Sequence, residues 1–313
     1  MGLQLDERYQ VEIYEAIKQA TAQRNRAAII MPPGTGKTIE ALKLIEDNPD
    51  KSVMYLSPSP KINAYIRKQI RSIYGKEADK ILSRITFKTY NGLMREYKTH
   101  PVDMKENGTD IIIEDEAHRA GAKEWGKAVE YLEQVNPNAT RLAMTATPIR
   151  SDGRNMLEEK CGEIDYHFKL TDAIARGVLT LPKWVCARYI FAEDIQRIEE
   201  KIARISDEKE RKKQEEKLAK AKRSLAKAEG VDEILARNME DINGKWLVFC
   251  NVGDDIEALQ AEAIEKGWYS RVNPNYQLLN VEAINPDIEN AYALRQFSKP
   301  KADDLRVMYS KIC

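Results

Sequence analysis

The sequence predicts an α/β protein whose parallel sheet is covered by helices on both faces. Short apolar runs alternate with amphipathic helical segments along the first 180 residues. The apolar runs are continuous rather than alternating, which is typical of strands buried on both faces. The chain has 313 residues, of which 42% are hydrophobic and 32% charged, and this fits a globular protein with room for two domains.

The elements of the first domain follow each other in regular order. Apolar side chains at helical spacing predict a helix over residues 7–24, and the apolar run at 27–31 predicts the first strand. A second helix is expected over 37–45, directly after a proline- and glycine-containing turn. Further strands are expected at 52–56, 84–87, 111–114 and 141–144, with a helix over 61–73. This alternation predicts one domain over residues 1–180.

The second part of the chain, residues 181–313, is expected to form another, smaller domain. Strands are predicted at 245–250 and 305–310, with a helix over 254–266. Upstream of them, isoleucines recur at intervals of three and four from residue 195, and residues 201–227 hold eleven Lys or Arg against five Asp or Glu. This predicts a charged helical insertion over 193–230, either one long helix or a two-helix coiled coil. Its charged surface is either simply solvated or a basic arm that contacts nucleic acid or a partner.

Composition narrows the function classes. Fifty basic and fifty acidic residues cancel, so any polyanion must be held by a local surface. The four cysteines lie far apart without a paired spacing and there are three histidines, so no zinc site is expected. No apolar stretch reaches the roughly 18 residues that a membrane span needs, and the N-terminus shows no signal peptide. We therefore expect a cytoplasmic protein with no membrane partner.

The segment from Met31 to Thr38 reads Met-Pro-Pro-Gly-Thr-Gly-Lys-Thr and lies between a predicted strand and a predicted helix. Glycines let successive backbone amides turn toward an anion, and the helix N-terminus adds its positive end. The pattern predicts a nucleotide phosphate loop formed by Gly34, Thr35 and Gly36, although Met31 stands where the strict pattern has glycine. Lys37 is expected to reach the β- and γ-phosphates of ATP, and the Thr38 hydroxyl to hold Mg²⁺.

A second acidic motif completes the predicted nucleotide site. The strand Ile111-Ile112-Ile113 delivers Asp115 and Glu116 at its carboxyl end, where ligands bind in open parallel sheets. We expect Asp115 to hold the Mg²⁺ shell and Glu116 to act as the general base that activates water.

These residues resemble the motifs of superfamily-2 helicases. Asp115-Glu116-Ala117-His118 resembles their DEAH box, and Thr145-Ala146-Thr147-Pro148 resembles their motif III. The surrounding residues are most similar to the motor part of restriction enzymes and related DNA translocases. The resemblance implies a RecA-like phosphate-loop NTPase fold and nucleic-acid-dependent ATP hydrolysis, with DNA favoured over RNA. It also implies that His118 couples the acidic pair to Thr145 and Thr147.

Weaker correspondences extend the resemblance. Arg8-Tyr9-Gln10 resembles the upstream element in which glutamine reads the adenine, which assigns that role to Gln10. Ser57-Pro58 resembles motif Ia and Thr89-Tyr90 resembles motif Ib, which contact nucleic acid in relatives. Arg150, just after motif III, is a further candidate phosphate contact.

The second domain matches the family only in part. Residues 173–179 resemble the crossing segment between two RecA-like lobes, residues 246–251 resemble motif IV, and residues 305–310 resemble the approach to motif V. The later arginine-rich motif VI, whose arginines stabilise charge on the γ-phosphate in relatives, has no counterpart. We therefore expect a C-terminally incomplete chain with a partial second RecA-like lobe, and weak turnover by this chain alone.

Two alternatives to this helicase or translocase ATPase remain open at this stage. One is an ATP-gated module that binds nucleic acid or protein with little turnover, and the other is the motor fragment of a restriction system. In the second case a nuclease or specificity subunit is the expected partner, because the sequence shows no nuclease-like cluster of acidic residues and lysine.

Overall fold

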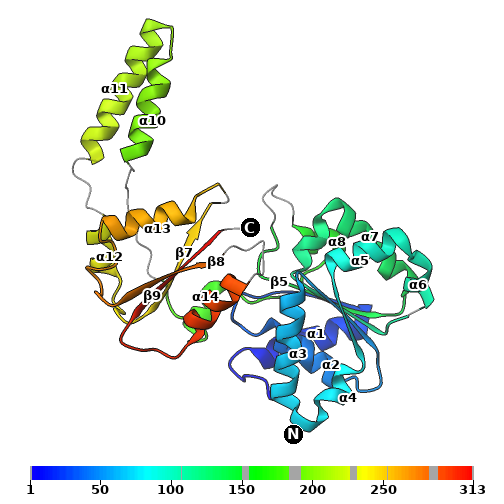
Figure 1. The fold of residues 1–313 in the computed structure, drawn as a ribbon. Helices are drawn as coiled ribbons and strands as arrows, with labels where there is room; N and C mark the ends of the chain where they lie inside the picture. Colours follow the sequence, from blue (N-terminus) through cyan, green and yellow to red (C-terminus); the bar gives the residue numbers. More distant parts are fainter. Residues whose placement is uncertain are drawn as a thin grey trace. The chain divides into compact units, whose positions relative to one another are not determined.

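The computed structural model of the chain describes residues 2–106, 108–149, 155–182, 192–225, 231–251, 253–281 and 288–311. Contacts divide the chain into two compact units, Met1–Pro182 and Lys183–Cys313. Each unit has its own sheet (Figure 1).

Unit 1, Met1–Pro182, contains six parallel strands in the order β3-β2-β4-β5-β1-β6. The strands are β1 (Arg26–Ile30), β2 (Val53–Ser57), β3 (Ile85–Thr89), β4 (Ile111–Asp115), β5 (Thr140–Thr145) and β6 (Tyr166–His167). Because all pairings are parallel, the carboxyl ends of the strands meet at one edge of the sheet. β5 lies between β1 and β4, so the segments that follow these three strands are neighbours. The predicted parallel α/β fold is confirmed.

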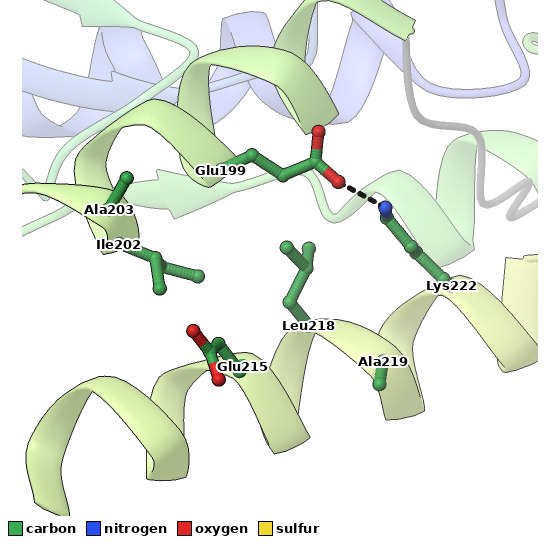
Figure 2. A pocket seen from close by; sticks show the side chains of 7 residues that line it. All are labelled: Glu199, Ile202, Ala203, Glu215, Leu218, Ala219 and Lys222. Atoms are coloured by element: carbon green, nitrogen blue, oxygen red, sulfur yellow. Dashed lines mark hydrogen bonds and ion pairs between the residues drawn. The ribbon is translucent and has the colours of Figure 1, made fainter. Parts of the chain in front are cut away.

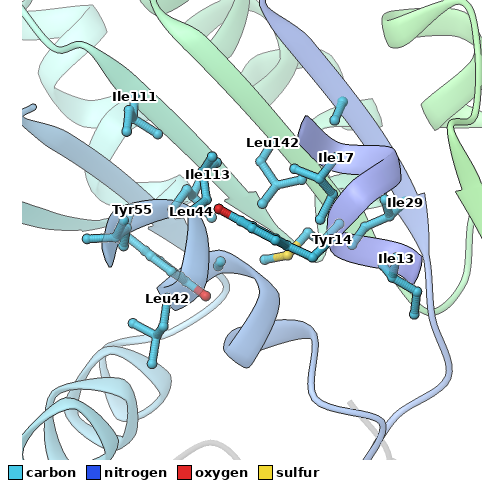
Figure 3. Packing of buried hydrophobic residues seen from close by; sticks show 14 of the residues in the cluster. Ile13, Tyr14, Ile17, Ile29, Leu42, Leu44, Tyr55, Ile111, Ile113 and Leu142 are labelled. Carbon is cyan, nitrogen blue, oxygen red and sulfur yellow. The ribbon is translucent and has the colours of Figure 1, made fainter. Parts of the chain in front are cut away.

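Helices cover both faces of this sheet, as the continuous apolar runs predict. Ile111 and Ile113 of β4 share a core with α1 (Gln10–Arg24), α2 (Lys37–Glu46) and α3 (Pro60–Tyr74) (Figure 3). Ile112 belongs to a second core, together with residues of α5 (Tyr90–Thr99) and α7 (Lys123–Val135). Full burial of one such side chain is worth about 1.5–3 kcal/mol. The three isoleucines therefore hold β4, and the acidic residues at its end, firmly in place.

Shorter elements complete unit 1: η1 (Gly75–Glu77), α4 (Ala78–Leu82), α6 (Pro101–Glu106), η2 (Ala117–Gly121), α8 (Met156–Cys161) and α9 (Leu170–Ala175). The first helix begins at Gln10 rather than at residue 7, because Tyr9 before it has a non-helical backbone with a φ of −161°. Helices α5 and α7 were not predicted from the sequence. Each contains a glycine, Gly92 or Gly126, which weakens a helical pattern.

Unit 2, Lys183–Cys313, contains a three-stranded parallel sheet in the order β7-β9-β8. The elements are α12 (Val231–Asn238), β7 (Lys245–Cys250), α13 (Ile256–Glu265), β8 (Tyr276–Val281), α14 (Ile288–Ser298) and β9 (Leu305–Lys311). One core joins Ile256 of α13 to Val307 and Tyr309 of β9, and a smaller one joins Ala293 of α14 to Met308. β8 was not predicted, because its polar Gln277 and Asn280 interrupt the apolar run.

Two helices, α10 (Ala192–Ala203) and α11 (Glu208–Leu225), lie side by side in the region of the predicted insertion (Figure 1). The helical stripe is therefore split in two rather than continuous. Asp207 accounts for the new start, because its carboxylate accepts the Glu210 amide at 2.9 Å, as a helix-capping residue does. Within the described ranges, no helix combines the length and the apolar character that crossing a membrane requires.

Candidate functional site

The loop between β1 and α2 has the backbone conformation of an anion-binding turn. Gly34 and Gly36 adopt φ angles of 80° and 86°, in the left-handed region that favours glycine. Gly36 is the residue that caps α2, so the first amides of this helix point toward the loop without intrahelical acceptors. A Cβ at Gly36 would also lie 2.4 Å from the Gln10 Nε2 atom. Both the φ angle and this close approach explain glycine here.

Hydrogen bonds hold this loop against β5 and against itself. The Met31 amide donates to the Thr145 carbonyl at 3.0 Å. The Thr35 hydroxyl donates to the Pro32 carbonyl at 2.7 Å and is fully buried, so Thr35 offers a ligand its backbone rather than its side chain. The Lys37 ammonium donates to the Met31 carbonyl at 3.2 Å. That bond folds the lysine back over the loop, where a phosphate is expected.

Gln10, at the first turn of α1, lies against this loop. Its side-chain carbonyl accepts the Asp6 amide at 2.8 Å, and the residue is buried. The structure therefore brings the predicted adenine-reading residue together with the predicted phosphate loop. Leu179 also packs there, since a Cβ at Gly34 would lie 3.6 Å from its Cδ2 atom.

Asp115 is the last residue of β4 and is only 7% exposed. Burial and the neighbouring negative charge of Glu116 together raise its pKa to about 6, against the opposing effect of Lys37. The Tyr90 hydroxyl donates to the Asp115 carbonyl at 2.9 Å. This bond fixes the end of β4, and the sequence analysis did not foresee it.

Glu116 has an unusual backbone. Its φ of 53° and ψ of 50° are left-handed, a conformation that is uncommon for a residue with a side chain. Such strain costs on the order of 1–3 kcal/mol and is often found at functional sites. Here it turns the chain sharply from β4 into η2, and the side chain reaches to 3.9 Å from the Lys37 Nζ atom. The Glu116 carboxylate is thus turned toward the phosphate loop.

A hydrogen-bonded network surrounds the Glu116 carboxylate. The Thr145 hydroxyl donates to Glu116 Oε2 at 3.3 Å, and His118 Nδ1 lies 2.8 Å from that hydroxyl and 3.4 Å from Oε2. The Thr147 amide donates to the Thr145 hydroxyl at 3.1 Å. Burial favours a higher pKa for Glu116, but the hydrogen bond from His118 and the charges of Lys37 and His118 outweigh it, and the pKa is lowered. The structure therefore brings together the predicted base and the three predicted coupling residues.

The residues predicted to contact nucleic acid differ in burial and in position. Ser57 and Thr89 end β2 and β3, at the same edge of the sheet as Asp115, and Pro58 follows Ser57. Ser57 is fully buried and its hydroxyl donates to the Ser59 carbonyl at 3.1 Å. The Thr89 hydroxyl accepts the Gly92 amide and caps α5.

Tyr90 corrects the sequence analysis. Tyr90 is the first residue of α5, and its buried side chain donates a hydrogen bond to the Asp115 carbonyl. It therefore offers no surface to a nucleic acid. The Ser57 side chain is unsuitable as a surface contact for the same reason. Arg150 lies outside the described residues.

Glu40 was also missed. It lies on α2 one turn after Lys37, fully buried, and neither carboxyl oxygen has a hydrogen-bond partner among the described residues. Glu40 lies four residues before Leu44, so the two share one side of a helix, and this spacing is the sequence signal that Glu40 is buried.

Comparisons with known proteins find similar sequences and folds. The model of the family "Type III restriction enzyme, res subunit" matches residues 5–150. No curated protein matches the chain. One similar solved structure is the ATP-dependent Type ISP restriction-modification enzyme LlaBIII bound to DNA, with 20% identity, a TM-score of 0.53 and coverage of 98% of this chain. This chain spans 24% of that protein.

A second similar structure is the helicase domain of Pyrococcus furiosus Hef. It is 15% identical, with a TM-score of 0.52 over 96% of this chain and 85% of that one. Likeness at this identity shows the fold alone, which is that of RecA-like helicase domains. Residues 5–150 are therefore similar to the domain of the type III restriction enzyme res subunit.

Proposed function

We propose that unit 1 binds Mg-ATP at the carboxyl edge of its sheet and hydrolyses it in response to nucleic acid, as the motor part of a restriction-type translocase. The observation that carries this proposal is the position of Glu116. Its carboxylate lies 3.9 Å from the Lys37 ammonium and 3.3 Å from the Thr145 hydroxyl. One carboxylate thus faces both the phosphate loop and the segment that follows β5.

The phosphates are assigned to the loop. The amides of Gly34, Thr35 and Gly36 and the N-terminus of α2 surround the anion, and Lys37 moves from the Met31 carbonyl to the β- and γ-phosphates. Gln10 holds the adenine edge from its place beside the loop. This arrangement accounts for a glycine at both positions of positive φ.

The Thr38 hydroxyl and the Asp115 carboxylate are the proposed Mg²⁺ ligands. Both are oxygen donors of the kind that Mg²⁺ prefers. The raised pKa of Asp115 shows a buried carboxylate beside another negative charge with too little positive charge near it, and a divalent cation supplies that charge. Held by Thr38 and Asp115, the ion would supply positive charge that offsets the negative charge of the phosphates.

Glu116 is the proposed general base. Its lowered pKa keeps the carboxylate ionised at neutral pH, so that it is free to accept a proton from the attacking water. His118 and Thr145 hold that carboxylate in place. Thr145 and Thr147 are proposed to transmit loss of the γ-phosphate to the nucleic-acid surface.

The proposed partner is nucleic acid, and DNA is favoured because the similar Type ISP enzyme was solved bound to DNA. Ser57, Pro58 and Thr89 remain candidate backbone contacts through their main chain at the sheet edge. A nuclease or specificity subunit is the proposed protein partner, and α10–α11 is proposed to be a two-helix coiled coil.

Steady-state ATP hydrolysis tests the proposal, measured with single-stranded DNA, duplex DNA and RNA. We expect stimulation by one polymer and loss of ATP binding in Lys37→Ala. Glu116→Gln should bind ATP but lose about 10²–10⁴-fold in turnover, which is the usual contribution of a general base. Glu124→Gln, an exposed carboxylate on α7, is the matched control and should be unchanged.

Full activity of Glu116→Gln would rule out its role as base, and unchanged ATP affinity of Lys37→Ala would rule out the phosphate-loop assignment. Tight ATP binding without turnover on any polymer would favour the ATP-gated binding module.

A further inference from the structure

We propose that α11 carries a contact surface for the phosphodiester backbone of a nucleic acid, on the face that points away from α10. Four lysines form this surface, which we call the lysine face: Lys209, Lys212, Lys213 and Lys220. The inference rests on the proposed function, because it assigns a second nucleic-acid contact to the same motor.

The inner face of α11 is occupied by α10. Leu218 lies opposite Ile202, and Lys222 forms an ion pair with Glu199 of α10 (Figure 2). Gln214, one turn before Leu218, is half-buried on the same side. The apolar side of α11 therefore faces α10, where Ile202 is buried and Leu218 is half-buried.

The lysine face is on the other side of α11. At 3.6 residues per turn, residues 209, 212, 213, 216 and 220 share one side of a helix, roughly opposite Leu218. The four lysines are exposed, and Glu216 is the one acidic residue among these five positions. Among the other acidic residues of α11, Glu210 binds Gln214 and pairs with Lys213 of the lysine face at 3.6 Å, and Glu215 pairs with Arg211.

Charge is concentrated here although the whole chain is neutral. α11 contains eight basic and four acidic residues, whereas α10 contains two basic and four acidic residues. The chain as a whole has fifty of each. The net charge of the complete chain therefore does not attract a polyanion, but the excess of basic residues on α11 provides a local positive potential.

The chemistry of the face identifies the partner. Lysine is depleted at protein–protein interfaces, which rely on aromatic and arginine anchors, and the five positions hold no apolar side chain. A membrane surface requires an apolar helix face, and α11 uses its own against α10. Lysine side chains are instead common phosphate contacts. From Lys209 to Lys220 the helix spans about 16 Å, beside which one strand of B-DNA presents roughly five phosphates.

Salt-dependent binding of a 30-base-pair duplex by fluorescence anisotropy tests the inference on the full chain. The variant replaces all four lysines of the lysine face with glutamine. We expect at least about 10-fold weaker binding at 0.1 M salt, and a slope of log K against log salt that is smaller by about 0.9 per lost phosphate contact. ATP binding should be unchanged because it belongs to unit 1, and an unchanged far-UV circular dichroism spectrum shows that the helices of unit 2 are still folded.

The control replaces four exposed lysines on other elements with glutamine and changes the net charge equally: Lys18, Lys80, Lys127 and Lys301. Equal weakening in both variants, or an unchanged salt slope in the lysine-face variant, would overturn the inference. Loss of binding to a polyglutamate probe, with duplex affinity unchanged, would assign the face to an acidic protein instead. If one of these outcomes overturns the inference, ATP turnover of the lysine-face variant separates it from the proposed function. Turnover that still responds to DNA would leave the proposed function standing.

Discussion

Replacing Glu40 with glutamine should stabilise unit 1, and the gain should grow from acidic to alkaline pH. Glu40 is 0% exposed on α2, and neither of its carboxyl oxygens has a hydrogen-bond partner among the described residues. Burial raises its pKa from 4.5 to about 8. The folded protein therefore holds this side chain in its neutral, protonated form over most of the physiological range.

The sign and size follow from proton linkage. Below pH 4.5 both folded and unfolded chains are protonated at this position, and there is no penalty. Between pH 4.5 and about 8 the unfolded chain releases a proton that the folded chain retains, so the free energy of unfolding falls by about 1.4 kcal/mol per pH unit. At pH 7 the accumulated loss is about 3 kcal/mol. Glutamine keeps the shape and cannot ionise, so it removes this loss.

Hydrogen exchange of β1 and β4 amides reports the stability of unit 1 separately from unit 2. We expect Glu40→Gln to match the parent protein near pH 4 and to exceed it by about 3 kcal/mol at pH 7. Glu15→Gln, an exposed position on α1, is the control and should follow the parent at every pH. Asp115 also has a raised pKa, but it is present in both proteins and cancels in the difference. An identical pH dependence of Glu40→Gln and the parent would refute the reasoning.

Two further predictions concern the loop and the metal. Affinity for Mg-ATP should fall as pH drops through about 6, because protonated Asp115 cannot bind Mg²⁺; ATP titrations from pH 5 to 8 should show this dependence, and Asp115→Asn should lack it. Gly36→Ala should lose ATP affinity in the same titration. Gly267 in unit 2 also has a positive φ, so Gly267→Ala is the control. It should cost about 1–2 kcal/mol of stability and leave ATP affinity unchanged. Equal ATP binding by both alanine variants would contradict the role of Gly36.

The sequence predicts the parts of the site that depend on chain order. The glycines at 34 and 36 and the acidic pair after an isoleucine run are local patterns, and they fix which segments end at the edge of the sheet. The direction of each side chain at that edge depends on what packs next to it. Tyr90 follows a predicted strand, but it is the first residue of α5 and is buried against β4. No local pattern in the sequence distinguishes this from a surface position.

Glu116 shows the same limit at the backbone. Two adjacent carboxylates are visible in the sequence, but the backbone turn at the second of them is not. Glu116 has a left-handed φ of 53°, a conformation that local preference disfavours. It is sustained by contacts from distant segments, namely Lys37 after β1 and Thr145 at the end of β5. The fold supplies this conformation, which the residues themselves do not predict.

Thr145 connects the two halves of the proposed site through different atoms. Its carbonyl accepts the Met31 amide at the start of the phosphate loop, and its hydroxyl donates to the Glu116 carboxylate. The same hydroxyl accepts the Thr147 amide, at the beginning of the segment that leaves the sheet. A change in the charge that Glu116 faces therefore acts on the Thr145 hydroxyl, which also accepts the Thr147 amide, while the Thr145 carbonyl holds Met31. This shared threonine is the physical basis on which we propose that ATP hydrolysis is coupled to movement at the nucleic-acid surface.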